Sequence, residues 1–344
     1  MKIQTNKIAP CKQEIKVDIP VDKLEQKMDN LYSQISRTAQ ISGFRKGKVP
    51  RNILEAHYRE EIKDKAIGET VTEAYSDAAK NFDFVPIDLP QISNVKLEND
   101  YLRFQATVET RPEVKLGRYK GIKLVKKEGK VNKDDVEQQL KFLQQIRQTS
   151  QQKNSAEKKQ DDLPPLDDEF AQQMGKSSLK ELKEAIREDL IQVRKEETDR
   201  KLESDLFEQI LKSSNFDLPD SLVQKQKKTL LENMQNYLAQ QGVEQEKIDS
   251  HLKESKKTAQ DRAVKELKIL FILDKIARQE KIEIGEQELN KEVEGIAQRF
   301  KKGVDEIKED IAKKGLIDDL KVKLRERKTV EFLIKESQVN ETTI

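Results

Sequence analysis

The stretch Ile15-Lys16-Val17-Asp18-Ile19-Pro20 begins a change of hydrophobic period that sets the start of the fold. Its apolar residues alternate with charged ones, as in a half-buried strand, and the proline then ends the strand. From the next residue the apolar positions take helical spacing, at Val21, Leu24, Met28, Leu31, Tyr32 and Ile35. The sequence therefore predicts a strand followed directly by an amphipathic helix.

Further elements complete an α+β domain that we expect to end near Leu116. Pro50 is placed to open a second, short helix. A third helix is marked by apolar residues at Ile67, Val71, Ala74, Tyr75 and Ala78. Two strands close the domain, at Ile92–Leu97 and Tyr101–Glu109, with the turn residues Asn99 and Asp100 between them.

The rest of the chain is expected to be a linker followed by a helical domain. Residues 117–162 form the linker, with a helix over Asp134–Ile146 and the polar tract Gln148–Asp162. Residues 163–344 have helical spacing almost throughout, interrupted at Gly175, Pro219, Gly242, Gly285, Gly303 and Gly315. Two apolar stripes are prominent, Leu222, Val223, Leu230, Leu231, Met234, Tyr237 and Leu238, and Leu289, Val293, Ile296, Ala297 and Phe300. We predict an all-α second domain.

The composition favours long helices with one apolar stripe over a compact sphere. Hydrophobic residues make up 35% of the 344, charged residues make up 38%, and Trp is absent. The 66 Lys and Arg residues nearly cancel the 64 Asp and Glu residues, leaving a net charge of +2. The net charge is therefore too small to attract the whole molecule to nucleic acid, and an anionic partner must bind at a local cluster of positive charge.

The sequence predicts a cytoplasmic protein without a membrane partner. Its single cysteine, Cys11, has no internal partner for a disulfide, and Met1–Val17 has charged residues where a signal peptide has an apolar core. The longest apolar run, Ile269–Leu273, is far shorter than the roughly 20 residues that span a bilayer.

The stretch Gly43-Phe44-Arg45-Lys46-Gly47-Lys48-Val49-Pro50 is the most informative one for function. Asn30–Leu54, 25 positions, contains no Asp or Glu, although acids make up 64 of the 344 residues. A local positive patch results, formed by Arg37, Arg45, Lys46, Lys48 and Arg51. Such a patch suits phosphate or an acidic protein surface, and Phe44 suits an anchor in a partner. The alternative is a solvated loop whose Phe44 folds back onto its own domain.

This loop, with Ile53, Leu54 and Tyr58 behind it, resembles the ribosome-binding signature of the trigger factor family of bacterial nascent-chain chaperones. The order of strands and helices over residues 1–116 is similar to that family's N-terminal domain. The stretch Leu163-Pro164-Pro165-Leu166-Asp167-Asp168-Glu169-Phe170, followed by Ser178-Leu179-Lys180-Glu181-Leu182, resembles the start of the family's C-terminal helical domain.

The resemblance implies a chaperone function. In the family the loop docks beside the exit tunnel of the large ribosomal subunit, so Phe44, Arg45 and Lys46 would make the key contacts. Supporting residues would be Gly43, Gly47 and Pro50, which shape the tip, and Lys48, Arg37 and Arg51. Nascent and unfolded polypeptides would be held, without ATP or another cofactor, in a cradle of C-terminal helices. Its two arms would lie around Pro219–Gly242 and within Glu286–Ser337, and a homodimer would form away from the ribosome.

One departure from the family is large. Most members carry an FKBP-like prolyl isomerase domain before the helical half, and here only Arg147–Asp162, 16 residues, lies in that position. An independent domain needs about 40–50 residues. We therefore expect no isomerase domain, no catalytic residues and no enzyme activity.

Two functions of other classes stay open: a prolyl isomerase, as the family name suggests, and a helical scaffold or RNA-binding protein whose patch contacts nucleic acid. A phosphate loop is not indicated, because only three residues separate the two glycines and Val49 follows Lys48. His57 and His251 lack neighbours at ligand spacing, so we expect helix-surface residues and no metal site. Cys11 is expected to be an inert thiol.

Overall fold

The structure is a computed structural model that describes residues 1–42, 44–98, 100–152 and 165–343. The predictions that involve Gly43, Asn99, Leu163, Pro164 and most of the polar tract lie outside these residues. The chain forms two compact units, Met1–Lys115 with Asn215–Phe271, and Leu116–Ser214 with Ile272–Ile344. Each unit is described by itself below, and the division at residues 116 and 162 stays a prediction.

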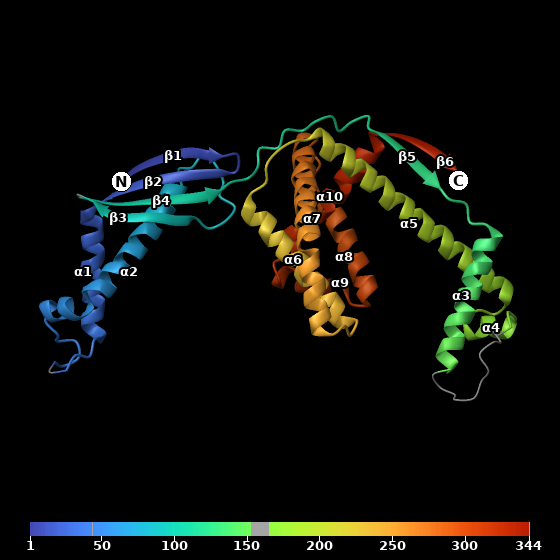
Figure 1. Cartoon of the computed structure of the whole chain (residues 1–344), viewed down its shortest axis with the longest axis horizontal. Helices are drawn as coiled ribbons and strands as arrows, with labels where there is room; N and C mark the ends of the chain where they lie inside the picture. The colour runs from blue at the N-terminus through green and yellow to red at the C-terminus, as the bar shows by residue number, and fades with distance from the viewer. Residues whose placement is uncertain (43, 99, 153–164, 344) are drawn as a thin grey trace. The chain divides into compact units, whose positions relative to one another are not determined.

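The N-terminal sheet has four antiparallel strands in the order β1-β2-β4-β3 (Figure 1). They are β1 (Lys2–Ala9), β2 (Lys12–Pro20), β3 (Gln91–Glu98) and β4 (Tyr101–Glu109). The three strands that the alternating pattern predicted are confirmed. β1 was not predicted, because it is an edge strand whose residues are almost all exposed and follow no apolar alternation.

One face of this sheet packs against a long helix. The sheet contributes the buried residues Ile15, Val17, Ile19, Leu102, Phe104, Ala106 and Val108. Val71 and Ala74 of α2 (Arg51–Ala79) complete this cluster. The two separate helices expected after residue 50 are a wrong prediction, since α2 is continuous. It contains no proline, and its interior Gly68 faces open space, so nothing there breaks the helix.

The first predicted helix is confirmed as α1 (Val21–Thr38), which buries Leu24, Leu31 and Tyr32. It runs beside α2, and the loop between them lies at the end of the pair away from the sheet (Figure 1). The first unit also includes α6 (Asp220–Gln240) and residues 245–271 of α7 (Gln245–Gln279).

The second unit confirms a helical C-terminal half and adds two strands that were not predicted. Its helices are α3 (Lys133–Gln152), α4 (Asp168–Gln173), α5 (Leu179–Ser213), α8 (Glu286–Phe300), α9 (Val304–Lys313) and α10 (Ile317–Lys335). β5 (Lys123–Glu128) pairs in parallel with β6 (Gln338–Thr343). The all-α expectation therefore fails at this small sheet. The helix expected over Asp134–Ile146 is confirmed within α3.

The predicted interruptions coincide with helix ends. Gly175, Gly242 and Gly315 follow α4, α6 and α9 with φ values of 78°, 74° and 66°, which glycine adopts without steric cost. The other three interruptions, Pro219, Gly285 and Gly303, are the N-cap residues of α6, α8 and α9.

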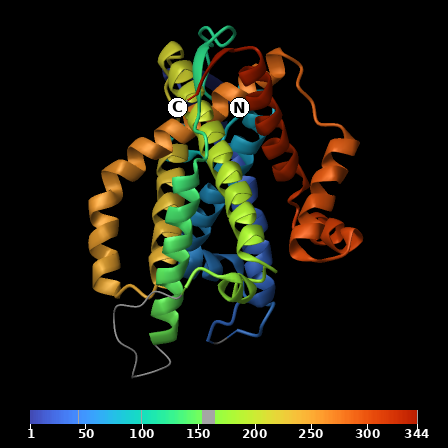
Figure 2. The same cartoon turned by 90° about the vertical axis from the view of Figure 1, so that its right-hand side faces the viewer.

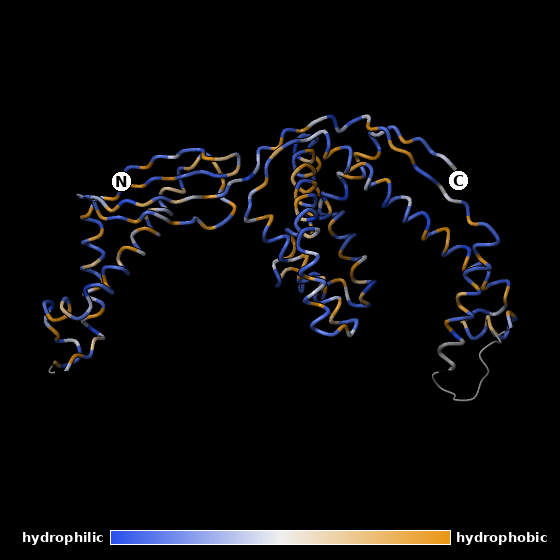
Figure 3. Tube along the Cα trace, viewed as in Figure 1, coloured by the Kyte–Doolittle hydropathy of each residue, from blue (hydrophilic) through white to orange (hydrophobic). Residues whose placement is uncertain are grey.

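Two helix groups of the second unit are visible in Figure 2. At the start of α5, the side chains of Val136, Leu140, Phe170, Leu182 and Ile186 form one apolar cluster from α3, α4 and α5. The other group joins α8, α9 and α10, drawn in orange to red. The helices in Figure 3 carry both polar and apolar residues along their length, and no described helix is long and apolar enough to cross a bilayer.

Candidate functional site

The loop between α1 and α2 is held at both ends by the domain core. Ala39 and Val49 are buried on either side of the tip, and Ile41 is partly buried. They pack in one apolar cluster with residues of both helices, Leu24, Leu31, Tyr32, Leu54, Ile62 and Ala66. The loop is therefore a structured projection with fixed ends.

A tight turn forms its tip. The amide of Lys48 donates a hydrogen bond of 2.9 Å to the carbonyl oxygen of Arg45, which closes a four-residue turn. Gly47, the third residue of that turn, has φ of +80°, the value that a type II turn requires there. An added Cβ would meet no atom within 4 Å. Glycine is thus favoured by its backbone conformation and not by lack of space.

Phe44 is 39% exposed at this tip. Its amide donates to the carbonyl oxygen of Ile41 at 3.1 Å, which fixes the backbone. Among the described residues its side chain belongs to neither apolar cluster of the domain. The ring is therefore available to a partner, as an anchor needs to be.

The cations of the predicted patch fall into two kinds. Arg37, Arg45, Lys46 and Lys48 are exposed, and none forms an ion pair with a described residue. Arg51 differs, because it pairs with Asp29 and, at 2.7 Å, with Glu55, and it lies 5.3 Å from the centre of the Tyr32 ring. The hydrogen bonds that Arg51 donates to the carboxylates of Glu55 and Asp29 raise its pKa. Arg51 therefore secures the loop against α1, and four other cations carry the available charge.

The start of α2 adds to the positive field of the loop. Pro50 is its N-cap residue and makes no side-chain capping bond, and the first turn has no acid. Helix N-termini carry about half a positive charge, which Asp or Glu commonly offsets. The first turn of α2 has no such acid, so the partial positive charge of the helix end adds to the attraction for an anionic partner.

A second surface, on α8 to α10, is apolar. A groove of about 400 Å3 is lined by the apolar residues Ile296, Ile311, Leu316, Leu320 and Val322 and by the charged residues Asp319, Lys323 and Glu326. Leu316 and Val322 are 43% and 40% exposed, and Phe300, at the end of α8, is 69% exposed. Such a surface can bind apolar side chains of another polypeptide.

Sequence reasoning located only part of this groove. Ile296 and Phe300 belong to a predicted stripe, whereas Leu316, Leu320 and Val322 were not singled out. Their spacing along α10 was a usable signal. On α6, the predicted stripe is partly exposed at Met234 and Tyr237.

The other candidate residues have ordinary positions. His57 of α2 and His251 of α7 are exposed on helix surfaces, as expected. Burial raises the pKa of the Cys11 thiol, which disfavours the reactive thiolate. Within the described residues, no three His, Cys, Asp or Glu side chains gather as metal ligands would.

Comparison with known proteins gives two matching family models. One, described as bacterial trigger factor protein, matches residues 1–143, and one for the C-terminus of the same protein matches residues 178–335. The trigger factor of Halothermothrix orenii is 26% identical over 430 aligned positions, which cover 98% of this chain and 100% of the relative. That of Halalkalibacterium halodurans is 26% identical over 419 positions, covering 94% and 96%.

A solved structure has a similar fold. It is described as "Promiscuous Substrate Recognition in Folding and Assembly Activities of the Trigger Factor Chaperone". The TM-score is 0.62 at 17% identity, and the match covers 98% of this chain and 100% of that one.

Proposed function

Because this chain belongs to the trigger factor family of ribosome-associated chaperones, we propose that its α1–α2 loop docks beside the exit tunnel of the large ribosomal subunit. Phe44, Arg45 and Lys46 make the main contacts. Gly43, Gly47 and Pro50 shape the tip, and Lys48 and Arg37 add positive charge. Arg51 contributes by holding the loop to α1. The observation that carries this proposal is a half-exposed Phe44 among cations that have no described acidic partner.

Docking of this kind combines two physical terms. Ribosomal RNA presents phosphates, so unpaired cations release counterions on contact and contribute salt-dependent affinity. A desolvated aromatic ring adds a term that depends little on salt, and it fixes the position of the loop. The fixed ends of the loop reduce the ordering cost that a mobile segment would carry.

The helical half then holds unfolded or nascent polypeptide. The groove on α8 to α10 and the exposed Met234 and Tyr237 of α6 offer dispersed apolar surface. Burial contributes about 25 cal/mol per Å2, so several shallow contacts can hold a chain and still release it without nucleotide hydrolysis. No cofactor is needed for this cycle.

The chain is also proposed to lack prolyl isomerase activity. The alignment with the Halothermothrix relative has 430 positions, 86 more than the 344 residues here, and only residues 144–177 lie between the ranges that the two family models match. Amide rotation has a barrier of about 18–20 kcal/mol, and lowering it needs a shaped, water-excluding pocket. Too few residues remain at this point of the chain for a domain that encloses one.

Three further parts of the proposal follow the family. The protein works in the cytoplasm, it forms a homodimer away from the ribosome, and it divides functionally into residues 1–116, 117–162 and 163–344. Analytical ultracentrifugation of the free protein tests the dimer, and a single monomeric species at micromolar concentration would contradict it.

Ribosome docking is tested by co-sedimentation of the full chain with large subunits, with naked ribosomal RNA as the comparison. We expect binding to the subunits and at least tenfold weaker binding to free RNA, since Phe44 needs a shaped site. Equal affinity for both would favour the RNA-binding scaffold instead.

Holding and isomerisation are tested together. Equimolar protein should delay aggregation of a denatured enzyme during refolding without ATP, and a protease-coupled assay on a proline tetrapeptide should show no turnover. Isomerase turnover would contradict the proposed lack of isomerase activity, and unchanged aggregation would remove the holding function.

A further inference from the structure

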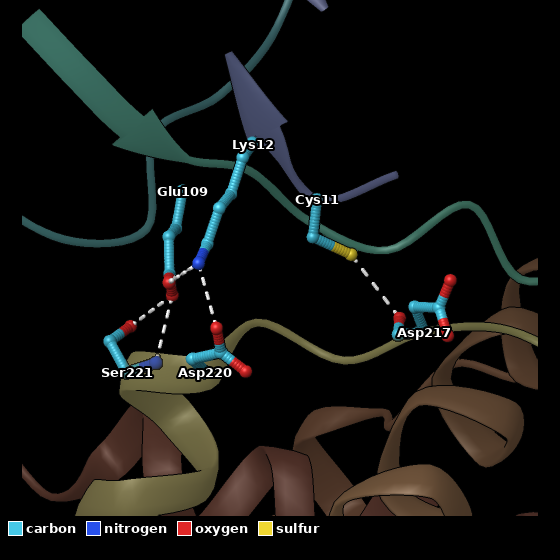
Figure 4. Close-up of polar contacts among 6 residues, drawn as sticks. All are labelled: Cys11, Lys12, Glu109, Asp217, Asp220 and Ser221. Atoms are coloured by element: carbon cyan, nitrogen blue, oxygen red, sulfur yellow. Dashed lines mark hydrogen bonds and ion pairs between the residues drawn. The ribbon is translucent and has the colours of Figure 1, made fainter. Parts of the chain in front are cut away.

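The first turn of α6 is capped by a residue from a distant strand. Its own N-cap residue, Pro219, offers no side-chain oxygen. Glu109, the last residue of β4, accepts hydrogen bonds from the amide of Ser221 at 2.9 Å and from its hydroxyl at 2.5 Å (Figure 4). One free backbone N–H of the first turn thus finds its acceptor on the N-terminal sheet.

A lysine joins the same two segments. Lys12 lies opposite Glu109 in the register of β2 and β4. Its ammonium is 2.7 Å from the carboxylate of Asp220 and 3.9 Å from that of Glu109. The hydrogen bond to Asp220 raises the pKa of Lys12. One cation therefore bridges an acid of the sheet and an acid of the helix.

The neighbouring cysteine makes a third link. Cys11 donates its thiol hydrogen to the carbonyl oxygen of Asp217, with Sγ 3.2 Å from that oxygen. Burial raises the pKa of the thiol, so it keeps the hydrogen that this bond needs. The links involve Cys11 in the β1–β2 turn, Lys12 and Glu109 on the sheet, Asp217 in the segment before α6, and Asp220 and Ser221 in its first turn; we call these six residues the latch.

The latch is polar and partly open to solvent. In the part of the chain that the structure describes, neither apolar cluster of the N-terminal domain includes a residue of α6. The Lys12 and Asp220 side chains are 35% and 76% exposed, so salt screens their attraction. Polar links of this kind each contribute little and can open without unfolding the sheet or the helix.

We propose that the latch is a detachable joint that holds the N-terminal sheet to the start of α6, so that the loop-bearing domain and α6 move together when it is closed and separately when it is open. This inference concerns motion within the first unit and does not depend on what the loop binds. Its consequence is that α6, with Met234 and Tyr237 exposed, takes its direction from the N-terminal domain while the latch is closed.

Distance measurements between the N-terminal domain and α6 test whether the latch holds them together. Nitroxide labels at Asn30→Cys on α1 and Gln235→Cys on α6 suit double electron–electron resonance in the full chain. The background is Cys11→Ser, which keeps a donor toward Asp217. We expect one narrow distance distribution for this parent and a broad one for Glu109→Ala with Lys12→Ala. Glu109→Gln, which keeps an acceptor for Ser221, should lie between them.

A matched control removes a similar pair from the same two strands. Arg103 and Asp18 pair at 3.4 Å and lie opposite each other in β4 and β2 without touching α6. Arg103→Ala with Asp18→Ala should keep the narrow distribution of the parent. Hydrogen exchange at the amide of Ser221 should accelerate about fivefold in the latch variant only, the effect expected from loss of one helix cap.

The outcomes are decisive in both directions. If the latch variant and the control give the same narrow distribution, the joint is wrong, even when amide exchange rises, because Glu109 would then only cap the helix. If the variant Glu109→Ala with Lys12→Ala does not fold, two other measurements replace it. They are the distance distribution of Glu109→Gln and that of the parent in 0.1 and 1 M salt. Distributions that stay narrow in both would also overturn the proposal.

Discussion

Two regions of the molecule share a short sequence pattern and differ in their electrostatics. The α1–α2 loop contains Phe44-Arg45-Lys46-Gly47, and the α8–α9 turn contains Phe300-Lys301-Lys302-Gly303. Each places an exposed phenylalanine before two cations and a glycine. In the loop, the cations have no ion pair with a described residue. In the turn, Lys302 pairs with Glu306 at 2.6 Å and lies 3.9 Å from Asp310.

The difference between the two regions lies in the acids around the pattern. Arg299, next to the turn, also has an acidic partner, Glu292 at 3.5 Å, and α9 begins with Asp305 and Glu306. The turn therefore offers an aromatic ring with compensated charge, which suits an apolar segment. The loop offers a ring with available charge, which suits an anionic surface.

The largest expected effect comes from removing the pattern from the loop. Phe44→Ala with Arg45→Ala and Lys46→Ala should abolish ribosome co-sedimentation, because losing an anchor and two cations costs more than about 2 kcal/mol, or roughly thirtyfold in affinity. The fold should survive, since all three side chains are exposed.

The turn supplies the control for that experiment. Phe300→Ala with Lys301→Ala and Lys302→Ala likewise removes one phenylalanine and two cations and should leave co-sedimentation unchanged. Equal losses of co-sedimentation in the loop variant and the turn variant would mean that the difference in charge pairing between the two regions does not determine docking.

Giving the loop an acid should make it resemble the turn. Asn52 is exposed in the first turn of α2, where an acid favours the helix N-terminus. We expect Asn52→Glu to hold or slightly raise the Tm and to weaken ribosome binding about tenfold at low salt, since it offsets nearby cations. Asn52→Gln is the neutral control. Stronger binding by the glutamate variant would refute the charge argument.

The backbone of the tip should matter less than its charge. Gly47→Ala places a side chain at φ of +80°, which costs about 1–2 kcal/mol unless the turn changes. We expect about fivefold weaker ribosome binding and a lower Tm, measured by co-sedimentation and thermal unfolding. Gly303→Ala, at an N-cap residue with φ of −66°, is the counterpart that should have no effect on docking.

The smallest effect is expected at the aromatic ring of the turn. Phe300→Ser should reduce the suppression of aggregation about twofold, because one exposed ring is a small part of a dispersed surface. Ribosome binding should stay the same. An unchanged aggregation assay would place client contact elsewhere on the helical half.

Local sequence patterns predicted the strands and helices whose buried residues recur at a regular spacing. β4 and α1 alternate or repeat their apolar residues with the period of their structure, so both were found at or within a few residues of their ends. β1 was missed because it lies at an edge, with Ile3 and Ile8 exposed. β6 was missed because Gln338–Thr343 is mostly polar and its stability comes from pairing with β5.

The loop could be predicted because its signal is local, an acid-free stretch around glycines and a phenylalanine. Sequence could not show that Arg51 already has acidic partners, since Asp29 comes from another helix. The latch was even less predictable from the sequence, because Glu109 and Ser221 are far apart in the chain and neither stands out from its neighbours in sequence. Only the folded chain brings them together.

The parallel pairing of β5 with β6 sets an order for biosynthesis. β5 emerges from the ribosome long before its partner is made, and at 5–20 residues per second the delay is roughly 10 to 40 s. During that time its backbone edge has no strand to pair with, and the sheet that closes the second unit is missing. The protein therefore passes through the unpaired state of any nascent chain before its own second unit is complete.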